Sequence, residues 1–304
     1  MWAETSRMRH PAPRRLAHWL GRNLARLHYA RHVEPTWLEV NRLPIPVRDL
    51  PAAFDGFRIV QLSDLHCGPK VTDDYLAEAV DRALAERPDL IVLTGDFIHK
   101  GYRHVGRAAA SVRRLAAPHG VYAVLGNHDY SIRNALGIRR HRHLHRAVEG
   151  ALAGEGVRVL RNEAVSLERG GAVLDLAGVD DLWSRACDLD RAYHGHEPAR
   201  PRLVLAHNPQ TVRHLGGRRC DLMLSGHTHG GQVDWPGLGR VTLGRKARRL
   251  AAGLYRHEET YVYVNKGVGF GWRFRFGVRP EVAVLTLRRA AAAPPLCNGP
   301  AADV

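Results

Sequence analysis

The sequence predicts an α/β protein, a four-layer α/β/β/α sandwich of two mixed sheets with flanking helices. Short apolar runs of strand length alternate with segments of helical periodicity. The run 90–93 is apolar throughout, as strands buried on both faces of a parallel sheet are. With 304 residues, 45% of them hydrophobic, the chain is long enough for one large domain with a full core and short appendages.

The first 53 residues are expected to form a basic amphipathic helix followed by a proline-rich connector. Five apolar side chains recur at helical spacing: Leu16, Trp19, Leu20, Leu24 and Leu27. Five arginines supply the polar surface: Arg14, Arg15, Arg22, Arg26 and Arg31. This pattern over residues 14–31 is typical of a helix that lies on an anionic membrane, and equally of a helix packed on the protein's own body. Pro44, Pro46 and Pro51 predict that residues 43–51 are a connector.

The core domain is expected over residues 54–288 and begins with two βαβ units. In chain order we expect a strand at 57–62, a helix at 73–86, a strand at 90–93, a helix near 105–115 and a strand at 121–125. Thr72 is the expected N-cap of the helix 73–86, whose acidic first turn holds Asp73 and Asp74.

The pattern changes after residue 130. Residues 130–149 are dense in Arg and His and predict a flank or lid, and the alternating His141, His143 and His145 are more typical of a solvated basic segment than of a metal site. Short strands are then expected at 157–160, 165–167, 173–179, 203–205, 222–224, 261–264 and 282–287, with the last two completing a second sheet. Residues 289–304, rich in Ala and Pro, predict a disordered tail.

The charge of the chain favours anionic partners. Forty-five Lys and Arg against 30 Asp and Glu give a net charge of +15, which suits phosphates, nucleic acid or an acidic membrane face. No recognisable nucleic-acid-binding motif accompanies this charge, so no specific nucleic-acid partner is expected. A basic nucleic-acid-binding protein or nuclease is the alternative of a different class.

Several features bear on the cellular location. The pair Arg14-Arg15 resembles a twin-arginine export signal, but Arg22 and Arg26 interrupt the apolar region that such a signal needs. No stretch approaches the roughly 20 apolar residues of a membrane-spanning helix. The four cysteines include no Cys-x-x-Cys pair, which suits a reducing compartment. We therefore expect a cytoplasmic protein, peripheral on the inner face of the membrane.

Five short motifs follow apolar runs in a fixed order. They are Asp64-Leu65-His66, Gly95-Asp96, Gly126-Asn127-His128-Asp129, Ala206-His207-Asn208 and Gly226-His227-Thr228-His229. Because the carboxyl ends of parallel strands meet at one edge of a sheet, we expect these side chains to gather there. Mixed carboxylate, amide and imidazole donors suit two divalent cations about 3.5 to 4 Å apart that share an anionic ligand. Together the motifs indicate a two-metal phosphoesterase site.

The ordered motifs resemble those of the calcineurin-like metallophosphoesterase superfamily, over residues 57–287. The resemblance implies that one metal ion is held by Asp64, His66 and His229, that Asp96 bridges, and that the second ion is held by Asn127, His207 and His227. Mn²⁺ is the expected ion, while Fe, Zn, Ni or Co suit the same ligands. A bridging water whose pKa falls toward ~7 would attack phosphorus in line.

The resemblance also implies that His128 is the catalytic residue, which protonates the leaving oxygen or hydrogen-bonds the developing charge. Many family members have an acidic residue three positions after the bridging Asp that orients this histidine. Here that position is His99, so the orienting partner is open, with Asp129 as a candidate.

Three further segments are similar to a bacterial phosphodiesterase subgroup that includes UDP-2,3-diacylglucosamine pyrophosphatase-like enzymes. They are residues 226–232, 265–269 and 279–281. This similarity implies a lipid-linked or nucleotide-sugar phosphoester at the membrane surface as the substrate. Trp272, Phe274 and Phe276 are either lipid contacts or core residues. A phosphomonoesterase or a cyclic-nucleotide phosphodiesterase is the nearer alternative.

Overall fold

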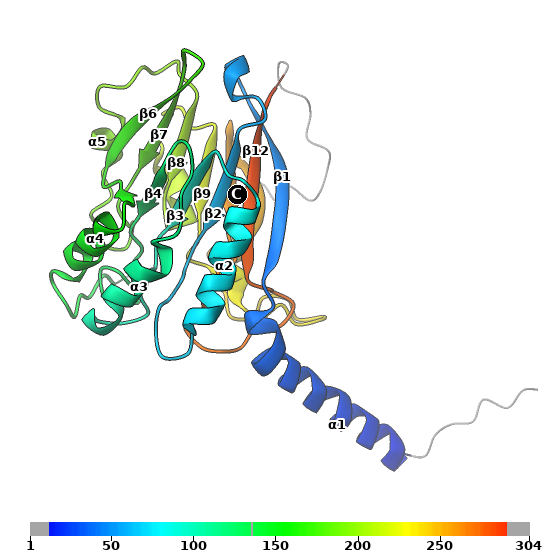
Figure 1. Cartoon of the computed structure of the whole chain (residues 1–304). Coiled ribbons are helices and arrows are strands. Elements are labelled where there is room, and N and C mark those ends of the chain that lie inside the picture. The colour runs from blue at the N-terminus through cyan, green and yellow to red at the C-terminus, as the bar shows by residue number, and fades with distance from the viewer. Residues whose placement is uncertain (1–11, 135, 291–304) are drawn as a thin grey trace, which may run out of the picture.

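Two six-stranded mixed sheets lie at the centre of the computed structural model, which describes residues 12–134 and 136–290 (Figure 1). In spatial order the first sheet contains β1 (Glu39–Val47), β12 (Glu281–Arg289), β2 (Arg58–Leu62), β3 (Leu90–Thr94), β4 (Val121–Val124) and β5 (Arg158–Val159). The second contains β10 (Gly253–His257), β11 (Thr260–Val264), β9 (Leu222–Ser225), β8 (Arg202–Leu205), β7 (Ala172–Gly178) and β6 (Glu163–Arg169). The predicted tail lies outside the described residues from residue 291 onward.

Helices cover the outer face of each sheet. The first sheet is covered by α2 (Asp73–Ala85), α3 (Val105–Val112) and α4 (Leu144–Gly154) (Figure 1). The second is covered by the short helix α5 (Leu189–Tyr193) and the 3₁₀ segment Pro209–His214. A separate apolar core fills the space between the sheets, with Ile59 and Val92 from one side and Leu203 and Leu224 from the other. The predicted four-layer sandwich is confirmed.

The predicted connector is wrong for most of its length, because residues 39–47 form β1 at the edge of the first sheet. The Glu39 N–H donates to the Pro280 carbonyl, and the Val47 carbonyl accepts from the Ala290 N–H. The backbone N–H and C=O groups of the odd-numbered residues of β1 therefore point toward β12. The backbone nitrogens of Pro44 and Pro46 point away from β12, on the free side of this edge strand. A missing N–H there costs no hydrogen bond between strands.

The strand predicted at 282–287 belongs to the first sheet, not the second. β12 lies between β1 and β2, parallel to the former and antiparallel to the latter. Val282 and Val284 pack toward the helices, while Ala283 and Leu285 pack toward the other sheet. An apolar run predicts such burial on both faces but does not specify the neighbouring strands. The second sheet is instead completed by β10, which the sequence did not predict.

The basic segment 130–149 is partly buried. His145 is 8% exposed, and its ring stacks on Tyr130 with the centroids 4.6 Å apart. The interpretation of the three histidines as solvated is therefore wrong for His145, which lies in the first turn of α4 and faces the core. His143 is exposed, as expected.

The N-terminal helix α1 (Ala12–His28) extends away from the two sheets (Figure 1). Its five apolar side chains from Leu16 to Leu27 are 46% to 65% exposed, so the alternative that they pack on the protein's own body is wrong. The segment after α1 is anchored, because the Ala30 carbonyl accepts from the Arg275 N–H and Tyr29 packs edge-on against Phe276. Within residues 12–134 and 136–290, no helix combines the length and apolar character that crossing a bilayer requires.

Candidate active site

The structure brings all eight predicted site residues together at the carboxyl ends of five strands. Asp64, His66, Asp96, Asn127 and His128 follow β2, β3 and β4 of the first sheet, while His207, His227 and His229 follow β8 and β9 of the second. β2, β3 and β4 are parallel to one another, and so are β8 and β9. The residues line or lie beneath a cleft of about 350 Å³.

One cluster contains Asp64, His66 and His229. Asp64 Oδ1 lies 3.3 Å from His229 Nε2 and 3.8 Å from His66 Nε2, and the two Nε2 atoms are 2.9 Å apart. The other oxygen of Asp64 accepts from the Ser63 hydroxyl at 2.6 Å and from the His227 N–H at 3.1 Å. These bonds fix the carboxylate so that Oδ1 faces both imidazoles.

The second cluster contains Asn127, His207 and His227. Asn127 Oδ1 lies 2.9 Å from His227 Nδ1 and 3.3 Å from His207 Nε2, and these two nitrogens are 3.2 Å apart. Asp96 lies between the clusters, with Oδ2 3.6 Å from His66 Nε2 and 3.3 Å from His207 Nε2. Its Oδ1 accepts from the His128 N–H at 2.8 Å, which holds the carboxylate in this orientation.

The donor set of the second cluster fits a cation. His207 Nδ1 must carry a proton, because it lies 2.7 Å from the Thr94 carbonyl, which can only accept. The amide nitrogen of Asn127 donates to the Ile132 carbonyl, so its oxygen faces His207. In the neutral imidazole, the Nε2 lone pair of His207 then faces the lone pairs of Asn127 and Asp96. A positive charge among these acceptors would relieve their repulsion.

Burial and neighbouring charges set the protonation of the two clusters. Burial lowers the pKa of His66 and His229 well below the usual value and that of His227 to about 3, so these imidazoles are neutral, as metal ligation requires. For His207, burial also favours the neutral form, but the carboxylates of Asp96 and Asp64 raise its pKa to about 10. The site therefore attracts positive charge strongly.

The backbone at the site is strained. Five site residues have φ between 46° and 73°, in the left-handed region: Asp64, His66, Asp96, His227 and His229. Such conformations are uncommon for residues other than glycine and cluster at functional sites. The motif glycines permit the close approach of the chains, because a Cβ at Gly126 would lie 2.2 Å from Asp96 Oδ1, and one at Gly226 would lie 2.3 Å from Asp64 Oδ2.

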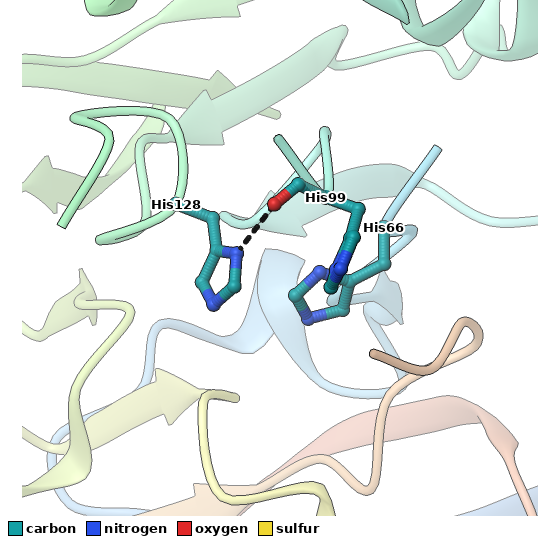
Figure 2. A group of neighbouring side chains, drawn as sticks. All are labelled: His66, His99 and His128. Atoms are coloured by element: carbon teal, nitrogen blue, oxygen red, sulfur yellow. Dashed lines mark hydrogen bonds between the residues drawn. The ribbon is translucent and has the colours of Figure 1, made fainter. Parts of the chain in front are cut away.

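The orienting partner of His128 is a backbone carbonyl rather than an acidic side chain. His128 Nδ1 donates to the His99 carbonyl at 2.8 Å (Figure 2). His99, at the position three residues after Asp96, thus contacts His128 through its main-chain carbonyl. Its ring lies beside those of His66 and His128, with ring nitrogens of all three within 4.8 Å of one another.

Asp129, the candidate orienting residue, has a different role. Its Oδ1 accepts from the Phe97 and Ile98 N–H groups, and its Oδ2 accepts from the Gly126 N–H. These bonds link the loop after β3 to the loop after β4. Asp129 therefore stabilises the backbone that carries Asp96 and has no hydrogen bond to His128 among the described contacts.

Arg275 is a site residue that the sequence did not identify. Its side chain is 0% exposed, and Nη2 lies 3.3 Å from His229 Nδ1 while donating to the Lys266 and Gly269 carbonyls. A further bond joins Nη1 to the Val278 carbonyl. The alternation of aromatic residues and arginines over 272–276 gave no signal that this one arginine faces inward.

We expect Arg275→Met to lower the free energy of unfolding by about 3 kcal/mol, because buried carbonyls would lose their donor. The matched control is Arg273→Met, which removes an exposed guanidinium two residues away and should change stability by less than about 0.5 kcal/mol. Urea unfolding of both variants measures the difference. Equal stabilities would contradict this role for Arg275.

The sequence also did not identify the residues that form the walls of the cleft. Arg133 and Trp183 lie on one part of the lining, and the Trp183 ring meets that of His227 edge-on with the centroids 4.4 Å apart. Gln232, Leu243 and Ala247 belong to the segment between β9 and β10, in which Ala247 lies in the short helix α6 (Arg245–Arg248). The lining therefore combines an exposed cation and an aromatic ring with apolar surface beside the two clusters.

Comparison with known proteins agrees with this geometry. Residues 57–231 match the family model described as calcineurin-like phosphoesterase. Phosphodiesterase YaeI of Escherichia coli is 34% identical over 260 residues, covering 85% of this chain and 92% of the relative. An uncharacterized metallophosphoesterase of Bacillus subtilis, YkuE, is 31% identical over 264 residues, covering 86% and 89%. UDP-2,3-diacylglucosamine pyrophosphatase LpxG of Chlamydia trachomatis is 30% identical over 301 residues, covering 84% and 91%.

Proposed function

The chain belongs to the calcineurin-like phosphoesterase family and is a metal-dependent phosphoesterase, and from this premise we propose that it hydrolyses phosphodiesters or pyrophosphates with two divalent ions. The observation that carries the proposal is the position of Asp96 Oδ2, within 3.6 Å of His66 Nε2 and 3.3 Å of His207 Nε2. One carboxylate oxygen faces both clusters, as a ligand shared by two cations must.

Seven side chains would hold the ions. Asp64, His66 and His229 would bind the first, Asn127, His207 and His227 the second, and Asp96 both. When bound, the ions would lower the pKa of a water toward ~7 and polarise the phosphoryl group. The neutral amide of Asn127 adds no negative charge, which leaves the centre attractive to a phosphate. Mn²⁺ is the ion we propose, because imidazole, amide and carboxylate donors all suit it.

His128 would move the proton of the leaving group. Its Nδ1–H is held by the His99 carbonyl, which leaves Nε2 to exchange a proton with the substrate in the cleft that His128 lines. In its protonated form, His128 would give the Nε2 proton to the leaving oxygen as the P–O bond breaks. General acid catalysis of this kind contributes about 10²- to 10⁴-fold in rate.

The proposed substrate is an anionic lipid-linked or nucleotide-sugar phosphoester, with the protein on the inner face of the membrane. Support comes from the relative named UDP-2,3-diacylglucosamine pyrophosphatase and from the apolar and cationic lining of the cleft. The cation of Arg133 would suit a second phosphate, and Leu243 and Ala247 would suit an apolar group.

The test compares bis-p-nitrophenyl phosphate with p-nitrophenyl phosphate, using metal-stripped protein reloaded with Mn²⁺. We expect no turnover without metal and a preference for the diester with Mn²⁺. A preference for the monoester would favour a phosphomonoesterase instead. Labelled UDP-diacylglucosamine left uncut by protein that cleaves the diester would exclude that substrate.

A further inference from the structure

The net charge of the chain is concentrated around the cleft and on α1. Four segments, residues 12–33, 131–143, 232–252 and 271–279, hold 17 of the 45 Lys and Arg but only one of the 30 Asp and Glu, Asp234. The remainder of the chain is therefore close to neutral. A charge of +15 spread evenly would indicate general solubility, whereas this distribution, even without the buried Arg275, indicates one strongly basic face.

Three of these segments form the mouth of the cleft, namely residues 131–134 with 136–143, residues 232–252 and residues 271–279, and we call them the rim loops. Each contributes to the cleft lining: Arg133 from 131–143, Gln232 and Leu243 from 232–252, and Gly271 from 271–279. Each also presents apolar side chains to solvent, and the five concerned are Leu136, Ile138, Leu238, Val241 and Trp272. They are 49% to 71% exposed. The rim is thus basic and tipped with apolar groups.

The fourth segment, residues 12–33, contains α1 and the π-helical turn Tyr29–Val33, and it leaves the body beside one rim loop. The Ala30 carbonyl accepts from the Arg275 N–H at 2.8 Å, and the Glu34 carboxylate accepts from the Val278 N–H at 2.6 Å. Figure 1 shows α1 emerging at the end of the molecule where the orange loop before β12 turns. The exposed apolar side chains of α1 and those of the rim therefore belong to the same end of the protein.

We propose that α1 and the rim loops dock together on an anionic phospholipid bilayer, so that the cleft opens onto the membrane surface. The inference rests on the proposed phosphoester hydrolysis, because it names the surface from which the site takes its substrate. Exposed Leu, Ile and Trp side chains flanked by arginines fit a headgroup region with acyl chains beneath it.

Other occupants fit this face less well. A second copy of the chain would bring two strongly basic surfaces together, which like-charge repulsion opposes. Nucleic acid would satisfy the arginines but would leave the tips Leu136, Ile138 and Leu238 in water, since no phosphate or base edge requires them. An anionic bilayer satisfies both the charge and the apolar tips.

The test measures cosedimentation of the full-length protein with vesicles of equal parts phosphatidylglycerol and phosphatidylcholine, and with pure phosphatidylcholine. The rim variant is Leu238→Asp/Trp272→Asp, and Leu136→Asp/Ile138→Asp provides a second pair on another loop. Leu20→Asp/Leu24→Asp tests α1. The matched control is Arg200→Glu, which also lowers the net charge by two. Arg200 is exposed and lies just before the amino end of β8, whereas the cleft lies at the carboxyl end of that strand.

We expect wild type to bind the anionic vesicles at least about tenfold more tightly than the neutral ones, and each paired variant to lose at least about tenfold. Arg200→Glu should bind as wild type does. Rim variants that are folded by circular dichroism and still sediment like wild type would overturn the docking of the rim. Tighter binding to duplex DNA than to anionic vesicles, at the same salt concentration, would overturn the choice of a bilayer.

Hydrolysis of soluble bis-p-nitrophenyl phosphate in the same samples separates the two proposals. If the protein binds vesicles but cleaves no diester with Mn²⁺, the proposed function is contradicted and the docking proposal still stands. Protein that cleaves the diester but ignores vesicles contradicts the docking alone.

Discussion

Asp96→Asn is expected to lower kcat/KM for a phosphodiester by at least about 10³-fold, equivalent to about 4 kcal/mol of transition-state stabilisation. Asp96 Oδ2 faces both clusters, through His66 and His207. The amide is neutral, so it would neither offset the charge of two cations nor serve well as their shared ligand. We therefore expect the loss of activity to accompany loss of bound Mn²⁺.

The measurement is metal content by inductively coupled plasma mass spectrometry, beside diester hydrolysis. Asp74→Asn is the matched control, because this substitution removes the same charge at an exposed position in the first turn of α2. It should retain both the metal and the turnover. A folded Asp96→Asn protein that keeps two Mn²⁺ per chain and full activity would contradict the bridging role.

The sequence predicted the central strands and the positions of the site residues for a physical reason. Strands buried on both faces of a parallel sheet are mostly apolar, so the apolar runs ending at Leu93 and Leu205 indicate both the strand and its carboxyl end, and the run 57–62 does so despite Arg58 and Gln61. Polar residues that directly follow the carboxyl ends of parallel strands must lie at the same end of the sheet. The shared position of Asp64, Asp96 and His207 therefore followed from local sequence alone.

Features that depend on contacts between distant segments were not predictable in this way. β12 pairs with β1 across more than two hundred residues, and nothing in its apolar run specifies that neighbour. Arg275 contacts carbonyls in a loop that only the fold brings around it. The orientation of His128 depends on a main-chain carbonyl at His99, and a main-chain group leaves no residue type to recognise in the sequence.

His128→Ala is expected to lower kcat by about 10²- to 10⁴-fold while leaving the Mn²⁺ content unchanged. The side chain lies beside the two clusters, yet its Nδ1 is engaged by the His99 carbonyl, and the seven proposed ligands are complete without it. Loss of the imidazole should therefore remove proton transfer and spare metal binding. His143→Ala, which truncates an exposed histidine before α4, is the matched control and should match wild type.

The leaving group of the substrate distinguishes proton transfer from simple electrostatic stabilisation. p-Nitrophenolate departs without a proton, whereas an alkoxide needs one as the P–O bond breaks. If His128 is the general acid, His128→Ala should lose at least about tenfold more activity on an alkyl phosphodiester than on bis-p-nitrophenyl phosphate. Equal losses on both substrates would mean that His128 stabilises charge on the phosphoryl group instead, and a loss of metal would place it among the ligands.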